Sequence, residues 1–193
     1  MTSSPRQSSR VLPIAVALGV AYAVLYTVID VSSDFGSTIG SPFWPAAGVT
    51  VVVLLLRPYR DWPVLLGVVM GVETLLDVRA GFGVPVSVAM GLANTAEPLL
   101  AATLLRRGGR EAPDLRRKDG LGRFLLYAVI AGPLLGASIG TFGPALVAGD
   151  AILPRLPRWF VGDAVGVLVI APAVDAVLRG RTDRSMVLPL LAV

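Results

Sequence analysis

Six long apolar stretches alternate with short polar segments along most of the chain. A run of about 20 apolar residues is long enough for a helix to cross the roughly 30 Å hydrocarbon core of a bilayer. The pattern therefore predicts an all-α integral membrane protein, a polytopic helical bundle. We expect six complete spans: Val11–Val31, Pro45–Leu56, Trp62–Val78, Val84–Leu105, Phe124–Ile139 and Trp159–Leu178.

The lysines and arginines sort to one side of a membrane when each stretch is taken as one crossing. Of the 17 basic residues, only Arg79, Arg155 and Arg158 fall in loops of the other side. Basic residues accumulate in short cytoplasmic loops, so we expect both ends of the six-span block to face the cytoplasm. With one crossing removed or added, the basic residues would be spread over both sides of the membrane, so their distribution supports an even number of spans. The cytoplasmic set is Arg6, Arg10, Arg57, Arg60, Arg106, Arg107, Arg110, Arg116, Arg117, Lys118, Arg123, Arg179, Arg181 and Arg184.

The two ends of the chain indicate its domain organisation. Residues 1–10 are expected to form a cytoplasmic N-terminal tail, and residues 11–193 an integral membrane domain. The first apolar run follows Arg6 and Arg10 as in a signal peptide, but no small-residue cleavage motif comes after it, so we expect a retained span. Residues 186–193 resemble the start of a seventh span, too short to cross, which predicts that the domain is truncated at its C-terminal end.

Composition supports a membrane protein and excludes several classes of site. Mean hydropathy is +0.74, and 16% of residues are charged, where soluble proteins have about a quarter. The net charge of +4 resides in short loops, so we expect no nucleic-acid partner. The chain has no cysteine and no histidine, which excludes disulfides, thiolate nucleophiles and Ser-His-Asp triads. We expect no enzyme activity, no cofactor and no metal.

Small residues recur every four positions within several spans. Gly132, Gly136 and Gly140 do so in the fifth span, and Gly67/Gly71, Gly162/Gly166 and Ala15/Gly19/Ala23 repeat the spacing. Such spacing lets helix backbones approach closely in lipid. It predicts a seam inside the bundle, with a homodimer interface as the alternative. Pro98, Pro133 and Pro172 lie inside spans and are expected to kink them.

Polar side chains at membrane depth are the main functional signal, because each is costly there unless it faces a partner or a cavity. The topology places Glu73, Asn94, Glu97 and Asp163 inside spans, whereas Asp30 and Asp77 are expected near the outer boundary, exposed to water. Pro98 removes the helical donor of the Asn94 carbonyl. Asp163 is expected in the first turn of the sixth span, where a helix N-terminus favours negative charge.

Two interpretations of these polar groups stay open. They either hydrogen-bond to one another and lock the bundle, or line an outward-facing pocket. Phe43 and Trp44 suit the aromatic belt of a membrane interface, but the prolines that bracket them would also pin the chain over a pocket mouth. The expected ligand-binding residues are Trp44, Glu73, Asn94, Glu97, Trp159 and Asp163.

Four motifs follow one another along the chain. They are Phe43-Trp44-Pro45-Ala46-Ala47-Gly48, Trp62-Pro63 with Gly67, Asn94-Thr95-x-Glu97 before Leu104-Leu105-Arg106-Arg107, and Trp159-Phe160-Val161-Gly162-Asp163-Ala164-Val165-Gly166 with Ala171-Pro172. Their order and spacing resemble the membrane-associated sensor family, type one (MASE type) of bacterial signalling proteins.

The resemblance covers about residues 11–180 and implies a sensory module of the bacterial cell membrane. Its expected partners are the lipid bilayer, an unknown small-molecule ligand and a cytoplasmic output domain in the same polypeptide. The resemblance implies an output domain of a kind that includes diguanylate cyclases, cyclic di-guanylate phosphodiesterases, histidine kinases and phosphatases. Family members typically have about eight spans.

Other classes of membrane protein fit less well. A substrate-binding subunit of an energy-coupling-factor vitamin transporter has a similar length and about six spans, and Ala15, Gly19 and Ala23 could dock its partner. An intramembrane aspartyl protease would place its aspartate in Gly-x-Gly-Asp, but the chain has Phe160-Val161-Gly162-Asp163 and no clear second aspartate at matching depth.

Overall fold

A computed structural model describes residues 11–33, 41, 43–107, 113–115, 117–149 and 155–178. All the regular secondary structure within these residues is helical, which confirms the all-α class. The helices are α1 (Val11–Ser33), α2 (Pro45–Leu56), η3 (Tyr59–Asp61), α3 (Trp62–Arg79), α4 (Val84–Arg106), α5 (Lys118–Phe124), the π-helical η4 (Leu125–Ala131), α6 (Gly132–Ala148) and α7 (Arg155–Leu178).

Local sequence explains where several helices begin. Pro45, Pro63 and Pro85 each stand at the first or second position of a helix, where the missing N–H costs nothing and the fixed φ already suits the helix. Trp44 and Gly83, just before α2 and α4, have ψ angles outside the helical range. The chain therefore turns from loop into helix within one residue at these points.

Four helices are long and apolar enough to cross a membrane. They are Val11–Val31 in α1, Val84–Arg106, the continuous helix Lys118–Ala148 formed by α5, η4 and α6, and Arg155–Val174 in α7. The expected second span, α2, has only 12 residues, and α3 carries Glu73, Asp77 and Arg79 within its 18. Length and composition thus show four of the six expected crossings. The expected seventh span lies outside the described residues.

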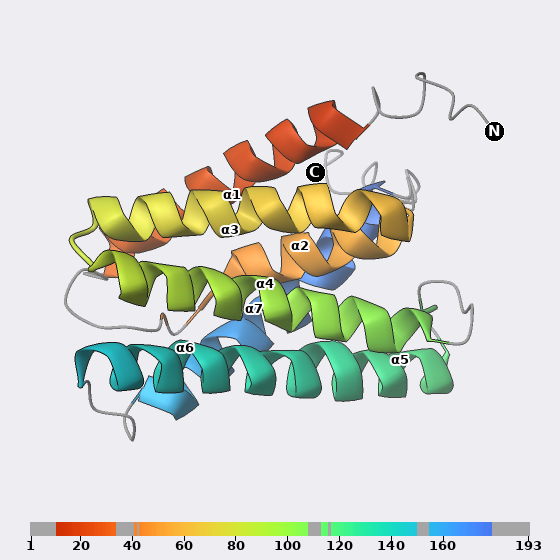
Figure 1. Cartoon of the computed structure of the whole chain (residues 1–193). Helices are drawn as coiled ribbons and strands as arrows, with labels where there is room; N and C mark the ends of the chain where they lie inside the picture. Colours follow the sequence, from red (N-terminus) through yellow and green to blue (C-terminus); the bar gives the residue numbers. More distant parts are fainter. Residues whose placement is uncertain are drawn as a thin grey trace, which may run out of the picture.

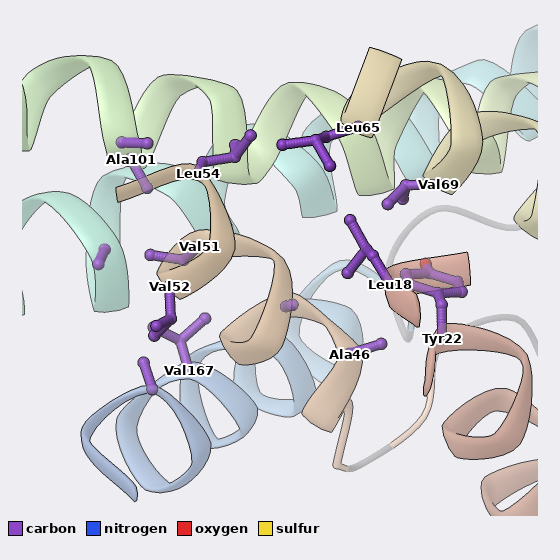
Figure 2. Packing of buried hydrophobic residues seen from close by; sticks show 14 of the residues in the cluster. Leu18, Tyr22, Ala46, Val51, Val52, Leu54, Leu65, Val69, Ala101 and Val167 are labelled. Atoms are coloured by element: carbon purple, nitrogen blue, oxygen red, sulfur yellow. The ribbon is translucent and has the colours of Figure 1, made fainter. Parts of the chain in front are cut away.

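The helices run alternately up and down a bundle with α4 near its centre (Figure 1). Helix α4 packs against α2, α3 and α6, while α7 packs against α2 and α6. Leu54, Val51, Leu65, Ala101 and Val167 are among the fully buried side chains that fill the space between α2, α3, α4 and α7 (Figure 2).

Most of the spaced glycines mark close approaches between helices. A Cβ atom at Gly48 of α2 would lie 2.8 Å from the Gly166 carbonyl oxygen of α7, and one at Gly19 of α1 would lie 2.9 Å from Val68 of α3. Small residues permit such contacts. Gly67 and Gly71 are different, because a Cβ there would meet nothing within 4 Å among the described residues, so the expected seam inside the bundle does not include them.

Two expected helix boundaries are also wrong. The fifth helix extends to Ala148 rather than Ile139, continuing through Gly143 and Pro144. The last helix begins at Arg155 rather than Trp159, so Asp163 lies more than two turns inside it and gains nothing from a helix N-terminus. In the fifth helix, the pair Gly143-Pro144 resembles a helix end in the sequence. Packing of α6 against α4 and α7 stabilises the helical conformation past this pair.

The π-helical segment Leu125–Ala131 precedes Pro133. The Gly132 N–H bonds to the carbonyl of Tyr127, five residues back, as in a π turn. A proline has no N–H to donate and its ring clashes with the carbonyl four residues before it in a regular α-helix. The wider turn accommodates the ring, which gives a physical reason for the π segment.

One end of the bundle is held by arginines. The Arg106 guanidinium donates to the Arg57 carbonyl oxygen at 2.7 Å and stacks over the Tyr59 ring, 4.4 Å from its centroid. Arg57 pairs with Asp61 at 2.6 Å, and Arg123 donates to the carbonyl oxygen of Leu105. We call this the basic end. The α2–α3 connection and the facing ends of α4 and α5 meet there, together with the start of α1 and the end of α7 (Figure 1).

Candidate ligand-binding site

A hydrogen bond between α3 and α4 forms the floor of the site. The Asn94 amide nitrogen donates to Oε1 of Glu73 at 2.6 Å, and both side chains are buried. Glu73 lies six residues before the end of α3 and Asn94 ten residues after the start of α4, which places them about 9–15 Å below the end opposite the basic end. The expected locking contact between polar groups is therefore present for this pair.

Trp44 forms one wall. Its backbone N–H donates to the Gly162 carbonyl of α7 at 3.0 Å, and a Cβ at Gly166 would overlap the Trp44 carbonyl. The indole is 5% exposed and packs edge-on against Tyr22 and Tyr26 of α1, with ring centroids 6.1 and 5.7 Å away. Trp44 is thus a buried residue that joins α1, α2 and α7, and its interpretation as a plain interfacial anchor is wrong.

Asp163 and Trp159 of α7 also line the site. The Asp163 carboxyl group lies beside the Trp159 indole and is a close neighbour of the Glu97 carboxyl group of α4. Two glycines on α6 leave space for the side chains of Glu97 and Trp159. A Cβ at Gly136 would lie 2.8 Å from Oε2 of Glu97, and one at Gly140 would overlap the Trp159 ring.

These walls line a small, partly open cavity of about 10 Å³, room for roughly one water molecule. Five of the six expected site residues line it: Trp44, Glu73, Asn94, Trp159 and Asp163. Glu97 does not line it but lies close to Asp163. Sequence-distant residues from the segment before α2 and from α3, α4 and α7 therefore share one small polar space.

The carboxyl groups around this space lack cationic partners. Across the described residues, no Lys or Arg nitrogen lies within 4.0 Å of Glu73, Asp77, Glu97 or Asp163. Oε2 of Glu73 and Oδ2 of Asp163 are buried and accept no hydrogen bond from any described protein group. Unpaired carboxyl oxygens at such depth are expensive and usually mark a functional site.

Four residues in and around the site were not predicted from the sequence: Tyr22, Tyr26, Ser41 and Asp77. Asp77, expected to be exposed to water, is 0% exposed and accepts a hydrogen bond from the Tyr26 hydroxyl at 2.9 Å, so that expectation is wrong. Tyr22 and Ser41 are buried as well, and Ser41 lines the cavity. The signal was the four-residue spacing of Tyr22/Tyr26 and of Glu73/Asp77, which places each pair on one helix face.

Comparison with protein families agrees with this picture. The MASE1 family model matches residues 14–188, nearly the whole chain. The chain belongs to the MASE1 family. MASE1 is a membrane sensory domain of signalling proteins, so the predicted resemblance is confirmed and the apolar helices are those of a multi-pass membrane protein. No curated protein and no solved structure matches the chain.

Proposed function

We propose that this MASE1 domain is the signal-input module of a bacterial plasma-membrane protein, and that its polar cavity binds a small ligand. The observation that carries the proposal is the cavity itself, where Glu73 and Asp163 each keep one buried carboxyl oxygen without a donor. Binding there would change the contacts between α3, α4 and α7. A cytoplasmic output domain in the same polypeptide would respond to that change.

The proposal includes six crossings with the basic end in the cytoplasm. Helix α3 runs alongside α4 over most of its length, whereas the shorter α2 begins partway along the bundle and ends at the basic end (Figure 1). We infer that α3 crosses with the four apolar helices and that α2 forms the cytoplasmic part of a further crossing. The basic end carries Arg57, Arg60, Arg106, Arg107 and Arg123 among the described residues, which supports a cytoplasmic position under the positive-inside rule. The N-terminus is then cytoplasmic.

Nothing favours the vitamin-transporter alternative. Gly19, the centre of the small-residue stripe that would dock a transporter partner, already packs against Val68 and Val72 of α3. The same contact supports a seam inside the bundle. A homodimer stays a prediction.

The decisive experiment is Asp163→Asn in the complete signalling protein. The change keeps the size of the side chain and its hydrogen bonding but removes its negative charge. We expect the variant to insert and fold while the output activity loses its response to stimulus or locks in one state. The measurement is the activity of the output domain with and without stimulus, beside thermal unfolding in detergent.

Asp119→Asn is the matched control, because Asp119 is an exposed carboxylate near the basic end whose side chain is 74% exposed. It should leave both readouts unchanged. If Asp163→Asn left the response and the stability of the protein unchanged as well, the cavity would have no part in signalling and the proposal would fail.

A further inference from the structure

The cavity chemistry narrows the class of ligand. Four carboxyl groups form a chain through the bundle: Asp77 and Glu73 on one face of α3, Asp163 on α7 and Glu97 on α4, with Glu73 and Asp163 close enough to interact electrostatically. Ionised carboxylates in this chain would repel an anionic ligand. A ligand that removes the cost of buried negative charge carries positive charge.

Size excludes most cationic ligands. The cavity holds about one water molecule, so an organic ammonium ion would have to displace Trp44 or Trp159. Within the residues that the structure describes, no group of three or more carboxylates is placed to hold a metal ion. A cavity for one water molecule also lacks room for the several waters that Mg²⁺ keeps. A monovalent cation needs fewer negatively charged ligands than a divalent cation does.

The lining supplies oxygen atoms, the ligands that hard cations prefer. Glu73 and Asp163 offer the two buried carboxyl oxygens that accept no hydrogen bond from the described protein groups. Ser41 contributes a hydroxyl oxygen that also bonds to the Phe43 backbone, at 2.9 and 3.3 Å. Asn94 uses its amide nitrogen for Glu73, so its carbonyl oxygen is the remaining acceptor.

We propose that one Na⁺ ion binds in this cavity between the carboxyl groups of Glu73 and Asp163, with Ser41 and Asn94 as neutral oxygen donors. A space the size of one water molecule has room for a bare Na⁺ or K⁺ ion. The two carboxylate groups favour Na⁺, because the smaller ion approaches their oxygens more closely and is attracted more strongly. The inference rests on the proposed function, since it names the ligand of the same site.

The test is ²²Na⁺ binding to the purified full chain in detergent, at fixed pH and fixed ionic strength. We expect saturable binding of one ion per chain, displaced by NaCl but not by KCl or choline chloride. Thermal unfolding should move to higher temperature in NaCl relative to KCl. Absence of saturable binding to the wild-type chain, or equal displacement by all three salts, would overturn the inference without any variant.

Variants locate the ion. Glu73→Gln and Asp163→Asn should each weaken ²²Na⁺ binding at least about tenfold, the effect of losing one charge-assisted contact, while Asp119→Asn should bind as the wild type does. Unweakened binding in both cavity variants would contradict the site.

A comparison with the signalling assay separates this inference from the proposed function. If Asp163→Asn abolishes the response but the wild type binds no Na⁺, the cavity signals for another ligand and only the Na⁺ inference falls. If Na⁺ binds as expected but the output ignores both Na⁺ and Asp163→Asn, the inference stands and the proposed function fails.

Discussion

At the scale of single residues, the cavity depends on how buried polar groups divide their hydrogen bonds. Asn94 satisfies Oε1 of Glu73, and the Tyr26 hydroxyl satisfies Oδ1 of Asp77. These two contacts fix the two carboxyl groups of α3 in place from opposite sides, one from α4 and one from α1. Only the oxygens that face neither contact remain for a ligand.

The Tyr26 contact is testable by removing one atom. Tyr26→Phe leaves Oδ1 of the buried Asp77 without its donor, so we expect the free energy of unfolding to fall by about 1.5–3 kcal/mol, as for a hydrogen bond to a charged group. Tyr127→Phe is the control, because Tyr127 is half-buried on the η4 segment and should change stability by less than about 0.5 kcal/mol. Equal losses in equilibrium unfolding in detergent would contradict the assigned role of Tyr26.

At the scale of elements, the crossing of α2 and α7 holds the wall of the cavity. Gly48 and Gly166 bring the two backbones together, and the Trp44 N–H bonds to Gly162 within the same contact. A side chain at this crossing would meet backbone atoms, which cannot rotate away as a side chain can. The Trp44 backbone can lie this close to α7 because Gly166 has no Cβ.

Gly166→Ala should separate α2 from α7. The added Cβ would overlap the Trp44 carbonyl, so we expect a loss of about 1–3 kcal/mol in unfolding free energy despite the better helix propensity of alanine. Gly67→Ala, where a Cβ meets nothing within 4 Å, should be neutral or stabilise by up to about 1 kcal/mol. The reverse order of stability in detergent would refute the close crossing.

The sequence could predict the polar helix residues that line the cavity because an apolar helix has few places for a polar or ionisable group. Glu73, Asn94 and Asp163 were expected to face inward. The distribution of arginines gave the direction of each span, and hence the depth of each of these residues in the membrane. Burial of Asp77 could not be read from depth alone, since it depends on Tyr26 of another helix. The length of the fifth helix also escaped, because Gly143 packs against Ala89 of α4 rather than ending the helix.

At the scale of the whole molecule, charge is distributed unevenly between the two ends of the bundle. Of the described basic residues, Arg79, Arg155 and Arg158 belong to the end near the cavity. The opposite end carries Arg57, Arg60, Arg106, Arg107, Arg117, Lys118 and Arg123. This asymmetry orients the proposed domain and places the cavity nearer the outer surface.

Cysteine labelling tests this orientation, since the chain contains no cysteine of its own. Gly83→Cys lies in the exposed loop between α3 and α4, and Asp119→Cys lies at the exposed start of α5. We expect a membrane-impermeant maleimide to label position 83 in intact cells and position 119 only after permeabilisation. Labelling of both positions in intact cells would rule out the proposed topology.

The continuous helix Lys118–Ala148 has a length that no other described element approaches. Its 31 residues at 1.5 Å each make about 46 Å, against roughly 30 Å of hydrocarbon. Hiding the surplus would need a tilt of about 50°, beyond the usual range of up to 40°. We therefore expect the helix to extend beyond the hydrocarbon at its Lys118 end, while Gly136 and Gly140 contact Glu97 and Trp159 inside the bundle. Membrane thickness and the packing around the cavity thus depend on the same continuous helix.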